Sequence, residues 1–270
     1  MKKILVPTDF SPVADNALQY AIEIAAAFKS ELFLYHVYSF DRFNYDLNYH
    51  EYEQPFAKEM ERKMKLTKQR LEEKIKQTGL SVTTFVERGN IPALFQSKVQ
   101  ELGIDLIVMG TKGATGLEKV VFGSVAAAAL EMAKVPVLVI PPGRSFRPIE
   151  HIVLAIDHKE TDANVLSPLQ KLAFNFGTGV TLLNVKTGSN QGVREIGSPT
   201  LKDVAITYRE VPLTKNINES INDYIKKEGC DLLCMIKREK GFFESIFQKS
   251  IATEQVYNSQ VPLLVLPEKR

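Results

Sequence analysis

The chain has 270 residues, of which 44% are hydrophobic and 24% are charged, as is typical of a soluble globular protein. Its formal net charge of +2 provides no strong field for nucleic acid or for an anionic membrane, so we expect neither as a partner. No apolar run approaches the roughly 20 residues of a membrane span, and the N-terminus lacks the apolar stretch of a signal peptide. We therefore expect a cytoplasmic protein of one large domain or two ordinary ones.

Strands and helices are predicted to alternate along the first half. The apolar run ILVPT (4–8) does not alternate with polar residues and indicates a buried parallel strand. Ser11 and Pro12 then open a helix, as N-cap and first-turn residue. A second strand covers Leu32–Val37, and a long charged helix begins near Phe56. The remaining predicted elements are strands over Val82–Val86, Asp105–Met109 and Val137–Ile140 and helices over Ile91–Leu102 and Ser124–Ala133.

The second half repeats the first. KILVPTD (Lys3–Asp9) recurs as HIVLAID (His151–Asp157), and VPVLVIP (Val135–Pro141) recurs as VPLLVLP (Val261–Pro267). The offset is 148 residues at the start and 126 at the end, so the second half lacks about 22 residues from its middle. The segment PPGRSFRP is suited to a joint between domains, because prolines and glycine favour turns and linkers. The expected domains are 1–142 and 149–270.

The segment MGTKGATGLEKVVFGS (109–124) lies where a parallel α/β sheet would bind a ligand, beyond the carboxyl end of a strand. Gly110 and Gly113 would let the backbone come close to a sugar, because glycine has no Cβ. Gly123 precedes a helix that Ser124 opens, and the first amide groups of a helix favour an anion such as phosphate. The pattern matches neither the P-loop nor GxGxxG, and a purely structural glycine-rich loop remains the alternative.

Several motifs together resemble the universal stress proteins: G-x2-G-x9-G-[ST] after the fourth strand, the opening ILVPTDFS, a second strand ending in HV, and the closing VPVLVIP. The resemblance covers both halves, so the chain is similar to a tandem member of that family. It implies an α/β fold of two tandem five-stranded parallel-sheet domains, each an adenine nucleotide alpha hydrolase-like or flavodoxin-like three-layer sandwich. It also implies antiparallel pairing of the two last strands in an intrachain pseudo-dimer, with a further homodimer left open.

The resemblance implies ATP or another adenine nucleotide as cofactor, bound without fast turnover. It brings the end of the first strand to the adenosine and the backbone of Val37 to the adenine. Asp9 would either hold Mg²⁺ with a triphosphate or hydrogen-bond a ribose, and the second role is favoured. The nucleotide-binding residues implied are Pro7, Thr8, Asp9, Val37, Met109, Gly110, Lys112, Gly113, Gly123, Ser124 and Val125.

The second half departs from this pattern. At an offset of 126, Ile236, Glu239 and Lys249 replace the three glycines, and only Ser250 matches Ser124. A branched or charged side chain would occupy or repel where a nucleotide must approach, with Ile236 placed where the ribose would lie. We expect this half to keep the fold and to lack the site. Its KREK run (237–240) is interpreted as a solvated turn, with an anion site as the alternative.

Other patterns indicate structural roles. The four histidines show no metal-ligand spacing, so we expect no protein-bound metal site, and His36 is assigned to packing or to the surface. Cys230 and Cys234 are predicted on one face of a strand, too far apart for a disulfide. The aromatic-rich segment 39–56 is interpreted as a packed cover, with a lid or a partner surface as alternatives. The charged helix after it is interpreted as solvated rather than as a face for nucleic acid.

The favoured function is a stress-response protein that binds adenine nucleotide in its first half and acts by conformation or by binding protein partners, which the sequence does not identify. A slow ATPase or nucleotidyl-transfer enzyme is the alternative from another class. It lacks an obvious base near the phosphates, because Glu118 is the only acid in the glycine-rich loop, and we predict no catalytic residue. A structural dimerisation module with an empty pocket is the third possibility.

Overall fold

The structure is a computed structural model that describes residues 1–39, 49–111, 126, 129–130, 134–156, 161–186, 201–238 and 261–268. The first half contains β1 (Lys3–Pro7), α1 (Pro12–Phe28), β2 (Glu31–Tyr38), α2 (Tyr49–Ile75), β3 (Val82–Arg88), α3 (Ile91–Leu102), β4 (Leu106–Gly110) and β5 (Val137–Ile140). The second half contains β6 (Ile152–Ile156), α5 (Ala163–Phe176), β7 (Val180–Lys186), β8 (Ile206–Pro212), α6 (Ile217–Glu228), β9 (Leu232–Lys237) and β10 (Leu263–Pro267).

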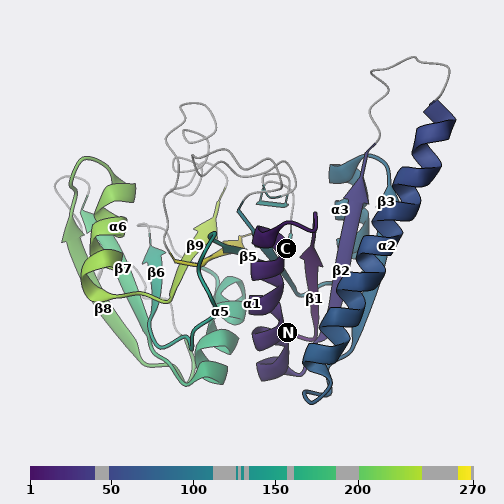
Figure 1. Ribbon diagram of the computed structural model, residues 1–270. Helices are drawn as coiled ribbons and strands as arrows, with labels where there is room; N and C mark the ends of the chain where they lie inside the picture. The colour runs from purple at the N-terminus through teal and green to yellow at the C-terminus, as the bar shows by residue number, and fades with distance from the viewer. Residues whose placement is uncertain are drawn as a thin grey trace.

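All ten of these strands form one sheet, in the order β3-β2-β1-β4-β5-β10-β9-β6-β7-β8 (Figure 1). Neighbouring strands within each half are parallel. The halves meet where β5 and β10 pair antiparallel, with Leu138 opposite Leu264. Two five-stranded parallel sheets therefore join into one, which confirms the predicted α/β fold class and the intrachain pseudo-dimer.

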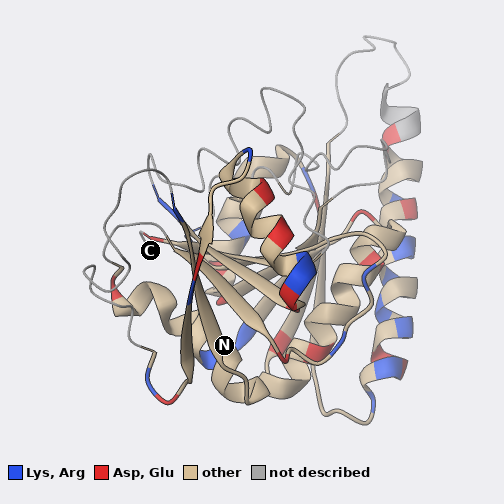
Figure 2. Cartoon of the chain, turned by 90° about the vertical axis from the view of Figure 1, so that its left-hand side faces the viewer, with Lys and Arg blue, Asp and Glu red and all other residues tan. Residues whose placement is uncertain are grey.

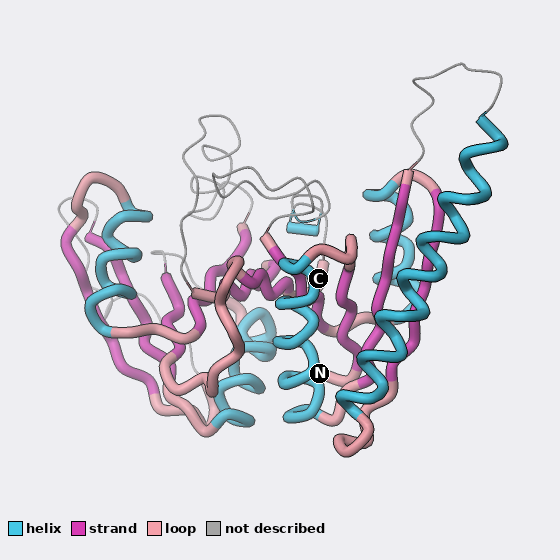
Figure 3. The backbone as a smooth tube through the Cα atoms, viewed as in Figure 1, coloured by secondary structure: helices cyan, strands magenta, loops and turns pink. Residues whose placement is uncertain are grey.

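Helices cover both faces of the sheet (Figure 3). The first hydrophobic cluster lies on the face packed by α1, α2 and α5, and it includes strand residues of both halves such as Leu34 and Leu154. The second cluster lies on the opposite face and combines Phe95 and Val99 of α3 with Ile221 and Ile225 of α6. Because each cluster spans both halves, the two halves share a continuous core.

Local sequence explains where the helices begin and end. Ser11 caps α1 by accepting the Ala14 N–H at 3.2 Å, and Lys29 ends it in the left-handed region with φ of 52°. Asn90 caps α3 in the same way, through the Ala93 N–H at 3.0 Å, and Gly103 ends it. These side chains satisfy amide groups that have no partner inside the helix.

Helix α2 differs from its predicted bounds. It begins at Tyr49, seven residues before the predicted start, and it accommodates Pro55 in its first turns. Its buried stripe contains Met64 and Leu71, as the spacing predicts, whereas Phe56 is 38% exposed. Residues of both signs of charge alternate along the helix (Figure 2), in line with a solvated face. No helix within the described ranges is long and apolar enough to cross a membrane.

The prediction that the two cysteines share a face is wrong. Cys234 lies in β9 and is buried in the cluster beneath α1 and α5, whereas Cys230 precedes the strand and is buried in the cluster beneath α3 and α6. Both thiols are free. The turn into β9 breaks the strict alternation that the sequence argument assumed.

Candidate functional site

The strand order reverses between β1 and β4, so the chain leaves these neighbouring strands toward opposite sides of the sheet. In an open parallel sheet this switch point is where ligands bind, beyond the carboxyl ends of the strands. The pairing of β1 with β2 continues beyond the strand, because the Thr8 N–H donates to the Tyr35 carbonyl at 2.9 Å. The pairing of β4 with β5 likewise continues through the Thr111 N–H, 3.2 Å from the Ile140 carbonyl. Both strands therefore deliver ordered backbone to the crevice.

The turn after β1 is held by its own side chains. The Thr8 hydroxyl accepts the Phe10 N–H at 3.0 Å, and the Asp9 carboxylate accepts the Ser11 N–H at 3.0 Å. Phe10 adopts a φ of 64°, which is uncommon for a residue with a Cβ and occurs where surrounding contacts fix the backbone. Thr8 and Asp9 thus first serve to shape this turn, and Ser11 then starts α1.

His36 supports the same turn from β2. Its Nδ1 is 2.7 Å from the Thr8 carbonyl, which makes Nδ1–H the donor, and its ring lies 4.6 Å from that of Phe10. Its Nε2 is buried and has no partner among the residues that the structure describes. Burial lowers the pKa of His36 below its ordinary value, although the Thr8 carbonyl and Asp9 oppose this shift. The assignment of His36 to packing is confirmed.

Three predicted site residues share one face of the sheet. Met109 belongs to the cluster on the α3 side, and Val37 packs against it. Pro7 follows Leu5 of that cluster by two residues, so strand alternation gives it the same face. The structure thus brings together residues from β1, β2 and β4 at adjoining strand ends.

Thr111 is a residue at this edge that the sequence analysis missed. It follows Met109 by two residues, is 6% exposed, and has a hydroxyl without a partner within the described part of the chain. Buried hydroxyls nearly always have a hydrogen-bond partner, so an orphan at a switch point indicates a place for a ligand or water. The available signal was a hydroxyl residue directly after the first glycine of the motif.

Gly110 has a structural reason to lack a side chain. A Cβ built there would lie 2.5 Å from Val13 Cγ1 and 3.1 Å from the Val13 carbonyl oxygen, in the first turn of α1. By alternation from Met109, this side of β4 faces α1 rather than the face that carries Pro7 and Val37. The close approach of α1 is therefore sufficient to require glycine here.

The other predicted nucleotide-binding residues lie outside the described residues: Lys112, Gly113, Gly123, Ser124 and Val125. Residues 40–48 of the aromatic segment also lie outside the described residues, so the assignment of this segment as a cover stays a prediction. Tyr38 packs edge-on against Phe56 at 5.4 Å, which ties the end of β2 to α2. No group of three or more potential metal ligands occurs among the described residues.

The corresponding edge of the second half contains a buried arginine. Arg238 is 4% exposed, donates to the Thr161 hydroxyl at 2.6 Å, and pairs with Glu268 at 3.2 Å. The interpretation of the KREK run as a solvated turn is therefore wrong for Arg238, whose partners Thr161 and Glu268 lie far away in sequence. Ile236 packs against the cluster that contains α5, on the same side as Gly110 in the first half, and not on the face of Met109.

Comparison with known proteins identifies the family. The model of the Universal stress protein family matches residues 1–141, about half of the chain. Universal stress protein MJ0531 of Methanocaldococcus jannaschii is 32% identical over 142 residues, which cover 52% of this chain and 81% of that protein. Universal stress protein MJ0577 of the same organism is 26% identical over 152 residues, covering 52% of this chain and 94% of that protein.

A solved structure matches the whole chain. A universal stress protein from Archaeoglobus fulgidus has a TM-score of 0.75 at 17% identity, and the match covers 98% of both chains. At this identity the likeness shows the fold alone. The arrangement of the two halves therefore also occurs within the single chain of that protein. The family match over residues 1–141 and the 32% identity with MJ0531 show the family as well as the fold. This chain belongs to the universal stress protein family.

Proposed function

We propose that the first domain, residues 1–142, binds ATP or a closely related adenine nucleotide, and that the second domain, residues 149–270, keeps the fold without a nucleotide site. The protein would act in a stress response through the conformation of the loaded domain or through protein partners. The observation that carries this proposal is the buried hydroxyl of Thr111 at the switch point, which has no partner among the described residues and follows Met109 by two residues.

The chemistry of the edge is consistent with an adenosine. Backbone at the end of β2 offers Val37 N–H and C=O groups to an adenine edge, and apolar Pro7 and Met109 offer flat contacts to the ring. Asp9, in the turn that follows β1, would accept a hydrogen bond from a ribose hydroxyl. The motif residues Lys112, Gly113, Gly123 and Ser124 would then take the ribose and phosphates, as family membership leads us to expect. Mg²⁺ would accompany a triphosphate through its phosphate oxygens.

The first test is to denature the purified full-length protein and to identify any small molecule that it releases. Titration with ATP follows, using Gly113→Val and its second-half counterpart Glu239→Val as a matched pair. We expect Gly113→Val to weaken binding by at least a hundredfold with little change in melting temperature, and Glu239→Val to bind as wild type does. Equal binding of ATP by both variants would show that the site lies elsewhere in the chain.

The same preparation separates a binding protein from a slow ATPase. Phosphate release that rises in proportion to protein and disappears in Gly123→Val would favour the enzyme. ATP recovered intact after long incubation would favour binding alone. A protein that releases no nucleotide and gives no heat with ATP would instead fit a structural dimerisation module.

A further inference from the structure

A small pocket lies at the joint between the halves, on the sheet face that carries α1 and α5. It has a volume of about 10 Å³, room for one oxygen atom of a ligand, and Leu138 and Pro262 form part of its wall. Polar groups reach it from α1 (Tyr20), from the linker (Arg144 and Arg147) and from the second half (Asp231). The proposed nucleotide site uses the opposite face, so this pocket is separate from it.

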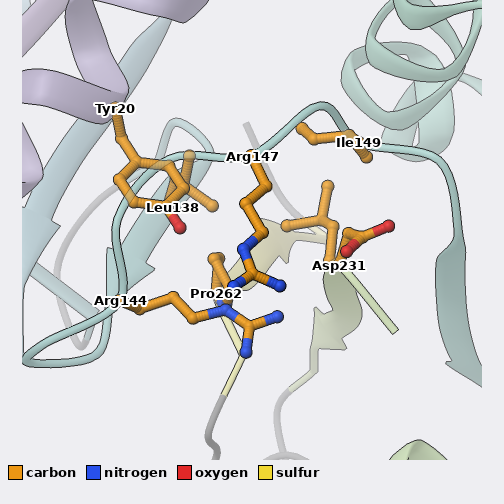
Figure 4. A pocket seen from close by; sticks show the side chains of 8 residues that line it. Tyr20, Leu138, Arg144, Arg147, Ile149, Asp231 and Pro262 are labelled. Carbon is orange, nitrogen blue, oxygen red and sulfur yellow. The ribbon is translucent and has the colours of Figure 1, made fainter. Parts of the chain in front are cut away.

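The two arginines converge on the pocket. Figure 4 shows their guanidinium groups directed toward each other below the Tyr20 hydroxyl. Among the residues that the structure describes, neither guanidinium group forms an ion pair with a carboxylate. Two like charges that face each other repel, and a bound anion would relieve that repulsion.

The neighbouring polar groups do not neutralise the pair. Tyr20 is 4% exposed, and its hydroxyl donates to the Ser145 carbonyl at 3.0 Å. Asp231 uses Oδ2 to accept the backbone N–H groups of Glu150 and His151, each at 3.1 Å, which fixes the start of β6. In Figure 4 its carboxylate points away from the guanidinium groups. Two guanidinium groups and one carboxylate line the pocket, so an excess of positive charge remains there.

We propose that this joint binds a small oxyanion, either inorganic phosphate or the phosphate group of a larger molecule. Planar guanidinium groups donate paired hydrogen bonds to phosphate oxygens, and two of them can share one tetrahedral anion. One oxygen would enter the cavity while the rest of the anion lies at its mouth beside exposed Arg147. Because the pocket joins the linker and α1 to the second half, the bound anion would stiffen the connection between the halves.

Equilibrium dialysis with radiolabelled inorganic phosphate tests the proposal. The measurements use full-length protein carrying Gly113→Val, which removes the proposed nucleotide site, at ionic strength kept constant with chloride. We expect one phosphate per chain with a Kd on the order of 1 mM. Arg147→Gln should weaken binding about tenfold, and Arg144→Gln with Arg147→Gln should abolish it. Arg209→Gln, at an exposed position on β8, is the matched control and should bind as the parent does.

Melting temperatures distinguish lost binding from lost folding. Arg147 is exposed, so the single variant should melt like the parent without phosphate and gain less stability when phosphate is added. Competition of labelled phosphate by AMP would identify the phosphate group of a larger molecule as a ligand. Competition by unlabelled phosphate alone would identify the free ion. Unchanged binding by the double variant, or no binding by the parent at 10 mM, would overturn the proposal.

Discussion

Gly110 ends β4 directly beside the first turn of α1, and its missing Cβ allows that contact. We predict that Gly110→Ala destabilises the protein by roughly 1–3 kcal/mol, because the new methyl group must displace Val13 or the backbone of the helix. Urea unfolding at neutral pH measures the change. In a Val13→Ala background part of the loss should disappear, since the nearest atom is Val13 Cγ1, while the carbonyl oxygen at 3.1 Å remains. Full stability of Gly110→Ala would contradict this packing role.

We predict that His36 makes the free energy of unfolding decrease at mildly acidic pH. Its pKa is lowered in the folded protein, chiefly by burial, with Lys63 adding to the decrease and with the Thr8 carbonyl and Asp9 opposing it. Below pH 6.5, the ordinary histidine pKa, His36 therefore binds a proton more readily in the unfolded chain than in the folded protein. Stability from the neutral ring is complete above that pH and is lost as pH falls through the lowered pKa.

The corresponding measurement compares urea unfolding at pH 7.5 and pH 5.5 for wild type and His36→Gln. We expect wild type to lose stability between these conditions and the variant to lose less, because glutamine can still donate to the Thr8 carbonyl and does not titrate. An identical decrease in wild type and His36→Gln would show that another group titrates.

A partly buried ionic network fastens α3 to β2 and β3. Lys98 contacts Glu87 at 2.7 Å and Glu101 at 2.9 Å, and its ammonium lies 4.8 Å from the centre of the Phe85 ring. The Tyr35 hydroxyl donates to Glu87 at 2.7 Å. Burial alone would raise the pKa of Glu87, but the hydrogen bonds from Lys98 and Tyr35 outweigh it, and the pKa is lowered.

We predict that Lys98→Met destabilises the protein by about 1–2 kcal/mol, because it leaves the partly exposed Glu87 without its cation. The exposed pair of Lys68 and Glu72 provides the control, since Lys68→Met should change stability by less than about 1 kcal/mol. The Glu87 contribution is present above the ordinary glutamate pKa of 4.5 and is lost as pH falls through the lowered value. Stability of Lys98→Met should therefore decrease less steeply between pH 5 and pH 3. A variant as stable as wild type would contradict the role.

The sequence predicts most of the elements because their signals are local. Capping by Ser11 and Asn90 and uninterrupted apolar runs need only a few neighbouring residues. The sequence Gly-x-Asp before the fourth strand of each half, Gly103–Asp105 and Gly229–Asp231, makes contacts that are not local. Asp105 accepts the N–H groups of Lys2 and Lys3, at 2.6 and 3.1 Å, as Asp231 does for the start of β6. A repeat of this kind is visible in the sequence, although its function as a clamp between neighbouring strands appears only in the fold.

The candidate site was harder to predict because its chemistry depends on distant pairs. Lys-Arg-Glu-Lys is typical of a solvated turn, yet Arg238 turns inward to meet Thr161 and Glu268, which are far from it in sequence. The orphan hydroxyl of Thr111 likewise depends on how β4 and β5 align beyond their ends. Periodicity assigns a residue to a face, but only the tertiary arrangement shows which polar groups lack partners.

The two halves of the molecule share one strand order but differ in the residues at the carboxyl ends of their strands. The seam between β5 and β10 is buried and apolar, with Val139 opposite Leu263 and Val137 opposite Val265. It removes two edges that would otherwise expose open backbone groups. A shared core then lets one half carry a ligand while the other is under no constraint to do so. The halves can therefore differ at their carboxyl edges without loss of the common framework.

We predict one adenine nucleotide per chain, bound by the first half alone. Arg238 lies at the carboxyl edge of β9, where its hydrogen bond to Thr161 and its ion pair with Glu268 take the space and the charge that a ligand would need. A hydrogen bond to a charged group contributes roughly 1.5–3 kcal/mol, so displacing the bond to Thr161 alone would weaken binding by about tenfold to a hundredfold. Titration calorimetry of the full-length protein with ATP should give a stoichiometry near one, unchanged in Arg238→Gln, because the glutamine removes the charge without restoring the glycines of the motif. A stoichiometry near two in wild type, with Gly113→Val abolishing only half of the heat, would show that both halves bind and that the asymmetry argument fails.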